Sequence, residues 1–249
     1  MTEPAADHDA SQGLFSHLLE LRSRLLRSVL VVMLVFAALM PFSQRLYAWL
    51  AQPLLSRLPA GAKLVAIDVS SPFLVPVKLT FLTALMLAMP YVIYQLWAFV
   101  APGLYRNERR MAVPLLVSAG TLFYAGCAFA YFLVLPTVFG FLSGVTPQGV
   151  SMMTDISHYL DFVSVMFLAF GVSFEVPVAV VILALLGWVT PQQLSAARSY
   201  AIVGAFVIAA ILTPPDVVSQ LMLAIPMVLL YELGLIAARI AVKPRSAAD

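Results

Sequence analysis

Glu20, Glu108 and Glu175 are the acidic side chains whose surroundings indicate specific chemistry. Glu20 lies in "HLLELRSRLL" (17–26) and Glu108 in "PGLYRNERRM" (102–111), both rich in arginine, whereas Glu175 lies in the apolar stretch "FGVSFEVPVAV" (170–180). Carboxylates bind guanidinium groups through charge-assisted hydrogen bonds that can be bidentate. Glu20 and Glu108 are therefore candidates for receiving a peptide that carries two basic side chains.

The spacing around Glu20 also allows a simpler interpretation. His17 precedes it by three residues and Arg24 follows it by four, so the three side chains share one face of a helix. An exposed Glu–Arg pair at this spacing stabilises a helix by a few tenths of a kcal/mol. The spacing alone favours this local ion pair, and the binding role remains open beside it.

Glu175 is the candidate for a charge inside the membrane. A carboxylate near the centre of a spanning helix costs about 2.5–3.5 kcal/mol on an insertion scale, so it is expected to face the protein interior or water. Pro177 removes a backbone donor and opposes the carbonyl of Ser173, which loosens the helix here. Gly171 and Ser173 leave room for another helix or a substrate backbone. A buried acid satisfied by a neighbouring hydroxyl is the alternative.

The turn "LTPPDVVSQ" (212–220) gathers the polar residues Thr213, Asp216 and Gln220 around Pro215. Asp216 is placed to cap the helix that follows, and capping explains it without any further function.

A second polar group contains Asp155, His158 and Asp161. Their spacing of three residues is also typical of helix capping, so it does not predict a metal site.

Residue patterns typical of enzymes are missing from the sequence. It contains no Ser-His-Asp set, phosphate-binding loop or Cys/His ligand pattern, and its one cysteine, Cys127, lies in an apolar run. We therefore expect no catalytic activity, no cofactor and no metal. A net charge of +2 gives no indication of a nucleic-acid partner.

The composition predicts a membrane protein. Hydrophobic residues make up 62% of the 249 residues and charged residues only 10%. A spanning helix needs about 20 apolar residues. Six candidate spans lie at 25–42, 73–99, 111–139, 159–188, 199–212 and 217–238. With no convincing internal repeat, we expect an all-α protein with a single six-helix membrane domain at 17–240.

The ends of the chain are expected to be tails. Residues 1–16 begin with a polar, acidic segment that resembles a disordered tail more than a cleavable signal peptide. Residues 241–249 form a short second tail.

Basic residues predict the orientation. Six spans place both termini on one side, and lysines and arginines gather on the cytoplasmic side. Ten of the 14 basic residues fall on the side of the termini: Arg22, Arg24, Arg27, Arg106, Arg109, Arg110, Arg198, Arg239, Lys243 and Arg245. Both termini are therefore expected in the cytoplasm.

Two further features concern helix lengths. The segment "SQRLYAWLAQPLLSRL" (43–58) predicts an amphipathic helix at the outer interface up to Pro53, with Leu46, Trp49 and Leu50 on one face; a loop packed over the bundle is the alternative. Only about 14 residues separate Arg198 from the proline turn at 213–216, so the fifth span reaches about 21 Å. Short fifth and sixth helices would thin the membrane on one side of the molecule.

Six motifs in order resemble the TatC family, the multispanning subunit of the twin-arginine protein translocase. They are "HLLELRSRLL" (17–26), "SPFLVPVKL" (71–79), "YQLWAFVAPGLYRNERR" (94–110), "FAYFLVLP" (129–136), "FGVSFEVPVAV" (170–180) and "TPPDVVSQLMLAIPMVLLYE" (213–232). The resemblance implies a cup of six helices in the bacterial cytoplasmic membrane. It also implies a non-enzymatic receptor for twin-arginine signal peptides of folded precursors, which works with TatA-type and TatB-type single-span proteins, oligomerises within the complex and uses the proton-motive force.

The resemblance also implies roles for individual residues. Signal-peptide recognition is implied for Glu20, Arg22, Phe99, Leu104 and Glu108. The path of partner or signal helices is implied for Glu175, Pro177, Thr213, Pro215, Asp216 and Gln220. Pro53 and Asp68 belong to the structured outer region, and Asp161 receives no role.

Two other classes remain as alternatives. An intramembrane acid is common in small-solute or ion transporters, although these usually show internal repeats or several polar residues at mid-depth. A passive assembly scaffold is the second alternative.

Overall fold

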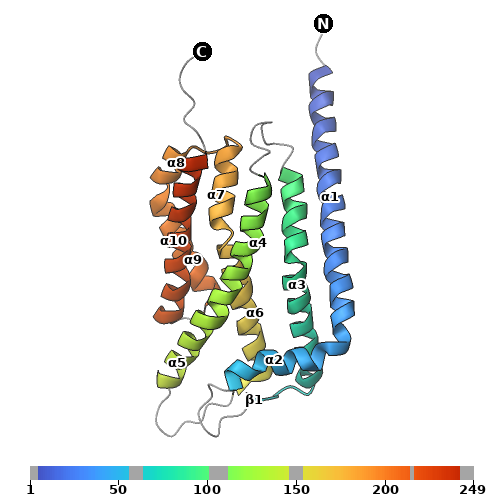
Figure 1. The fold of residues 1–249 in the computed structure, drawn as a ribbon, viewed down its shortest axis with the longest axis vertical. Coiled ribbons are helices and arrows are strands. Elements are labelled where there is room, and N and C mark those ends of the chain that lie inside the picture. Colours follow the sequence, from blue (N-terminus) through green and yellow to red (C-terminus); the bar gives the residue numbers. More distant parts are fainter. Residues whose placement is uncertain (1–4, 56–63, 101–111, 146–153, 214–215, 242–249) are drawn as a thin grey trace.

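The computed structural model describes residues 5–55, 64–100, 112–145, 154–213 and 216–241, which form a bundle of helices (Figure 1). In chain order the helices are α1 (Ala5–Leu39), the short turn η1 (Met40–Phe42), α2 (Ser43–Leu55), α3 (Ser71–Val100), α4 (Ala112–Phe129), the π-helical turn η4 (Ala130–Val134), α5 (Leu135–Val145), α6 (Ile156–Ser173), α7 (Val176–Leu185), α8 (Pro191–Ala196), α9 (Arg198–Leu212) and α10 (Val217–Ala241). Two strands of two residues each, β1 (Leu64–Val65) and β2 (Thr154–Asp155), complete the described elements.

Five segments of the described chain are long and apolar enough to cross a membrane. They run over Leu18–Trp49, Ser71–Phe99, Val113–Phe141, Ile156–Leu185 and Val217–Ala241. The remaining apolar helix, α9, has 15 residues and is about 22 Å long. The predicted all-helical membrane fold is confirmed, and the fifth predicted span is the short helix α9.

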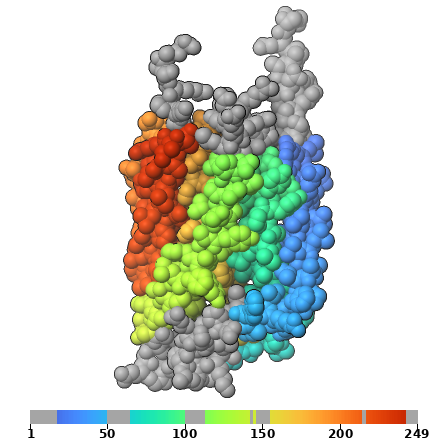
Figure 2. Space-filling view, viewed as in Figure 1, coloured from blue at the N-terminus to red at the C-terminus, as the bar shows by residue number. Residues whose placement is uncertain are grey.

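Helix α1 stands at one edge of the bundle and packs against α3 (Figures 1 and 2). It begins at Ala5, so the helix includes residues 5–16, for which the sequence predicted a disordered tail. The reason is that a helix, once nucleated, gains one backbone hydrogen bond per added residue, and the alanines of this segment favour that extension. Only 11% of the apolar window of α1 is buried, so most of this helix faces away from the bundle.

The third predicted span is interrupted by a feature that the sequence analysis missed. Helix α4 passes into α5 through the π-helical turn η4. Pro136 lies two residues after this turn, where it cannot donate a backbone hydrogen bond and its ring opposes the carbonyl of Phe132. The π turn accommodates this conflict without ending the helix.

Helix α2 lies across one end of the bundle rather than along it (Figures 1 and 2). Leu46 and Tyr47 pack on a small core made by Val75 and Leu79 of α3 and Leu160 of α6. Trp49, predicted on the same face as Leu46, is instead 81% exposed. The helix also continues past Pro53 to Leu55. Both sequence interpretations are therefore partly right, because an amphipathic helix packs over the bundle.

The same end of the bundle carries a short parallel ladder between β1 and β2, in which Leu64 pairs with Thr154 and Val65 with Asp155. The ladder joins two connections that are far apart in sequence. It was not predicted, because two-residue strands have no recognisable alternation.

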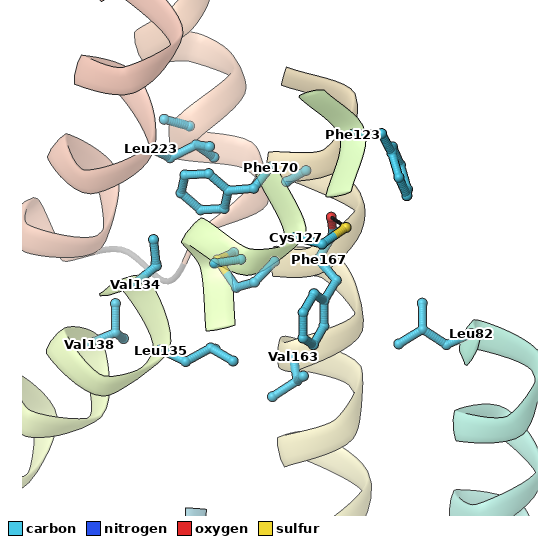
Figure 3. Packing of buried hydrophobic residues seen from close by; sticks show 14 of the residues in the cluster. Leu82, Phe123, Cys127, Val134, Leu135, Val138, Val163, Phe167, Phe170 and Leu223 are labelled. Atoms are coloured by element: carbon cyan, nitrogen blue, oxygen red, sulfur yellow. Dashed lines mark hydrogen bonds between the residues drawn. The ribbon is translucent and has the colours of Figure 1, made fainter. Parts of the chain in front are cut away.

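The core centres on the contact between α4 and α6 (Figure 3). Two glycines allow this close approach. A Cβ added at Gly126 would lie 2.5 Å from the carbonyl oxygen of Phe170, and one at Gly171 would lie 2.6 Å from the ring of Phe123. Gly171 thus makes room for the ring of Phe123 on the neighbouring helix. The sequence predicted this room for another helix at Gly171.

Candidate functional site

Glu20 lies on α1 and is held by Arg24 one turn later. The Arg24 guanidinium donates from Nε at 3.0 Å and from Nη2 at 2.6 Å, and both bonds end on Oε1 of Glu20. The Glu20 side chain is 39% exposed and that of Arg24 is 22% exposed. The local ion pair predicted from the spacing is confirmed. Both recorded bonds use one carboxylate oxygen, so Oε2 is available for another donor within the described structure.

Arg24 also connects α1 to α3. Its Nη1 donates to Oε1 of Gln95 at 3.3 Å, and Nε2 of Gln95 donates to the hydroxyl of Tyr91 at 2.6 Å. Gln95 is only 5% exposed, so its amide is buried with both recorded partners. The sequence analysis missed Gln95 and Tyr91. The sequence feature that could have identified them is a glutamine four residues after a tyrosine within an otherwise apolar helix, a spacing at which the two side chains can form a hydrogen bond.

The other residues predicted for the same function are only partly described. Arg22 on α1 is exposed and Phe99 near the end of α3 is half-buried. Leu104 and Glu108 lie outside the described residues. The predicted cooperation between Glu20 and Glu108 therefore remains a prediction.

Glu175 lies at the break between α6 and α7. Helix α6 ends at Ser173 and α7 begins at Val176, with Pro177 in its first turn. The Ser173 hydroxyl donates to the carbonyl of Ala169 at 2.6 Å and does not satisfy the acid. Oε1 of Glu175 is buried, and the described residues offer it no hydrogen-bond partner. The loosening predicted beside Pro177 is confirmed, and a neighbouring hydroxyl does not pair with this oxygen.

The turn between α9 and α10 contains the other predicted polar residues. Oδ1 of Asp216 accepts a hydrogen bond from the backbone N–H of Ser219 at 2.7 Å, which confirms the predicted cap. The buried Thr213 hydroxyl donates to the carbonyl of Ala209 at 2.8 Å, and Gln220 Nε2 donates to that of Phe206 at 3.3 Å. Pro215 lies outside the described residues.

Oδ2 of Asp216 and the hydroxyl of Ser219 are also buried without a partner in the described structure. These two atoms and Oε1 of Glu175 are the buried side-chain atoms without a hydrogen-bond partner among the described residues. They lie at the break between α6 and α7 and at the start of α10. Such atoms carry a desolvation cost of about 1–3 kcal/mol each unless water or another chain binds them.

At the end of the bundle near α2, the second polar group is structural. Oδ1 of Asp155 accepts from the backbone N–H of Ile67 at 3.3 Å, and Oδ2 lies 3.5 Å from Nδ1 of His158. Burial raises the pKa of Asp155, but the backbone donors and His158 outweigh it and hold this pKa below its usual value. Asp155 thus fastens the β1 connection to the start of α6.

Asp161, for which no role was assigned, forms an ion pair with Lys78 at 3.0 Å and so links α6 to α3. Of the two residues predicted for the outer region, Asp68 is exposed and its carbonyl accepts from the backbone N–H of Ser71 at the start of α3. Pro53 lies within α2, near its end.

Within the part of the chain that the structure describes, no group of three or more His, Cys, Asp or Glu side chains could hold a metal ion.

These features define a class: an all-helical, multi-pass membrane protein with unpaired polar groups at helix breaks and helix ends. The family model for the Sec-independent protein translocase protein TatC matches residues 16–226, so the chain belongs to the TatC family. It is therefore a component of a Sec-independent protein translocase and a multi-pass protein of the bacterial inner membrane.

Known relatives agree with this assignment. The TatC protein of Azotobacter chroococcum is 57% identical over 92% of this chain and 89% of its own length, and that of Escherichia coli K12 is 52% identical with the same coverage. The chain covers 64% of the length of the TatC protein of Halothiobacillus neapolitanus, at 53% identity. A crystal structure described as the twin arginine translocase receptor TatC superposes with a TM-score of 0.81 at 35% identity, over 91% of this chain and all of that one.

Proposed function

We propose that this chain is the receptor for twin-arginine signal peptides within its translocase, and that Glu20 and Glu108 receive the two arginines. The proposal extends the family assignment to specific side chains. It assigns no catalytic step to the chain, and every role proposed below is one of binding or positioning.

The geometry of Glu20 is the observation that supports the proposal most. A free carboxylate on a helix surface would be a flexible acceptor, whereas Arg24 holds Oε1 through two donors and is itself held by the buried Gln95. Oε2 can then accept from an incoming guanidinium without displacing Arg24. Glu20 keeps a partial exposure of 39%, which a binding residue requires.

We propose six membrane spans, with both termini and the loop at 101–111 in the cytoplasm. The distribution of basic residues supports this orientation. It counts α9 as a span, although this helix is about 8 Å shorter than the roughly 30 Å hydrocarbon core. Local thinning of the bilayer would accommodate the difference.

We propose that single-span partners of the TatA and TatB type pack near Glu175 and the α9–α10 turn. The buried, unpaired atoms of Glu175, Asp216 and Ser219 support this placement, because a polar side chain of a partner helix or water carried with it would satisfy them. The energy source in this proposal is the proton-motive force.

Peptide binding to the full chain in lipid nanodiscs tests the proposed receptor site. One peptide carries paired arginines and a second carries paired lysines in the same sequence. The double variant E20Q/E108Q is expected to lose most of the preference for arginine, because the amides no longer provide charge-assisted acceptors for a planar guanidinium with several fixed donors, whereas lysine presents only a point charge. Glu232→Gln is the matched control, because Glu232 is likewise an acid paired with an arginine, Arg198, but lies on α10, at the opposite side of the bundle from α1 (Figure 1). Equal binding of both peptides to the unaltered protein would refute the receptor site.

A further inference from the structure

A depression of about 520 Å³ lies between α8 and the last turn of α10, a volume within the range of about 300–1,000 Å³ that is typical of small-molecule sites. Its lining residues are Pro191, Gln192, Ser195, Ala196 and Arg239. None of them belongs to the sites considered above. Figure 1 places α8 beside α10 at the end of the bundle opposite to α2.

The depression has well-fixed walls. Helix α7 ends in a Schellman turn in which Trp188 donates to the carbonyl of Leu183 and Gly187 takes a φ of 72°. Thr190 and Gln193 then form a reciprocal capping box at the start of α8. The chain therefore reaches the wall of the depression through two turns of defined geometry.

Two contacts tie α8 and the start of α9 to α10. The Tyr231 hydroxyl donates to the carbonyl of Leu194 at 2.7 Å. Arg198 and Glu232 form a two-pronged ion pair, with Nε to Oε1 at 2.7 Å and Nη2 to Oε2 at 2.8 Å. Beneath them Leu194 packs in an apolar cluster with Leu235 and Ala238 of α10. These contacts hold α8 against α10, the two helices whose residues line the depression.

The lining favours an anion. It contains the guanidinium of Arg239, the amide of Gln192 and the hydroxyl of Ser195 as donors, and no acidic side chain. The charge of the nearby Arg198 is already balanced by Glu232, whereas the described structure records no ion pair for Arg239. A planar guanidinium with a hydroxyl and an amide beside it matches the oxygens of a phosphate group.

The surroundings indicate that this anion carries apolar chains. Arg239 lies at the end of the membrane-spanning segment Val217–Ala241, where the lipid headgroups begin. Ile236 and Ile240 of the same helix are 51% and 78% exposed, and Trp188 is 74% exposed. Exposed tryptophan is enriched at the membrane interface. A ligand bound here would contact the hydrogen-bond donors of the depression at one end and the exposed apolar side chains of α10 at the other.

We propose that the depression between α8 and the end of α10 binds the phosphate headgroup of a membrane phospholipid. Arg239 holds the phosphate, Ser195 and Gln192 donate to its oxygens, and the acyl chains lie along Ile236 and Ile240. Basic pockets beside spanning helices at the cytoplasmic surface bind lipid headgroups in this way. The bound lipid would fill the space between the short helix α8 and the spanning helix α10 and would hold α8 at the bilayer surface.

Native mass spectrometry of the full chain in detergent tests the proposal, with phosphatidylglycerol as the titrated probe. Arg239→Gln and the space-filling Ala196→Phe are each expected to weaken the tightest lipid-binding event roughly tenfold, since one charge-assisted contact or the cavity itself is lost. Arg27→Gln, which changes an exposed arginine on α1 that does not line this depression, is the matched control and should leave that event unchanged. Thermal unfolding of each variant, compared with that of the unaltered protein, shows that the fold is retained.

Two further probes separate the sources of phosphate. Diacylglycerol, which lacks the phosphate, should not occupy the site, and inorganic phosphate at millimolar concentration should not displace the lipid. Unchanged lipid binding in both Arg239→Gln and Ala196→Phe, or an equal loss in Arg27→Gln, would overturn the proposal. Displacement by inorganic phosphate would overturn the lipid assignment and indicate a site for the free anion.

Discussion

The guanidinium of Arg24 places two hydrogen bonds on a single oxygen of Glu20, at 3.0 and 2.6 Å, and leaves the second oxygen of that carboxylate without a partner in the described structure. An ion pair at this spacing is usually a small contribution to helix stability. Here the same arginine also reaches Gln95 on the neighbouring helix, so the pair fixes the direction of the carboxylate. A local ion pair and a binding role are therefore compatible, because the pairing leaves one oxygen for the ligand.

Gln95→Leu is expected to weaken binding of a paired-arginine peptide several-fold without unfolding the protein. Leucine fits an apolar spanning helix, but it removes the acceptor that orients Arg24. Tyr91→Phe removes only the hydroxyl that accepts from Gln95 and should have a smaller effect in the same direction. Peptide titration of both variants measures this order. An effect of Tyr91→Phe as large as that of Gln95→Leu would contradict the proposed chain of contacts.

Gly126→Ala is expected to destabilise the protein by about 1–3 kcal/mol, the usual cost of overpacking a core. Its new Cβ would lie 2.5 Å from the carbonyl oxygen of Phe170, which belongs to the backbone and cannot turn away. Gly120→Ala on the same helix is the control, because nothing lies within 4 Å of its added Cβ. Thermal unfolding in detergent compares the two variants, and a Gly120→Ala variant as unstable as Gly126→Ala would reject the steric argument.

Glu175→Leu is expected to leave the free energy of unfolding unchanged or to raise it, while it reduces export of twin-arginine precursors in cells. The buried Oε1 has no partner in the described chain, so its removal relieves a desolvation cost. If the acid instead maintained the fold, leucine would lower stability and activity together. Unfolding of the purified variant and an export assay, measured side by side, distinguish the two outcomes.

Asp155→Asn is expected to loosen the end of the bundle that contains β1 and β2, and this effect should depend on pH. The pKa of Asp155 in the folded protein lies below its usual value of 3.8, so its contribution to stability is complete above that pH. The contribution is lost as the pH falls through the lowered pKa. The difference in unfolding between the unaltered protein and Asp155→Asn should therefore be full at pH 7 and shrink as the pH falls below 3.8. A constant difference across this range would show that ionisation is not involved.

The sequence predicted those features that depend on residues close together in the chain. The long apolar runs, the break beside Pro177, the cap at Asp216 and the pair of Glu20 with Arg24 all follow from local spacing. The short length of α9 also followed from counting residues.

Features that depend on tertiary contacts could not be predicted. Lys78 and Asp161 are 83 residues apart, and Arg24 and Gln95 are 71 apart, so no spacing connects them. The prediction that Trp49 shares the buried face of α2 with Leu46 was wrong. The residues of α2 that become buried depend on its contacts with α3 and α6, which the sequence of α2 alone does not reveal. The helical start at Ala5 could not be predicted, because a polar composition is shared by disordered tails and by solvent-exposed helix ends.

The π turn η4 has a consequence for the direction in which the following helix faces. The buried residues Ala130, Val134 and Val138 succeed one another at steps of four. In a regular α-helix each step of four residues would rotate the row of buried side chains around the helix axis by about 40°, because 3.6 residues complete one turn. The wider turn offsets this drift, so Phe139 still meets Tyr159 and Phe162 of α6, with ring centroids 5.5 and 5.6 Å apart. Deleting one residue within 130–134 would restore regular geometry, yet it would swing those aromatic contacts away by about 100°.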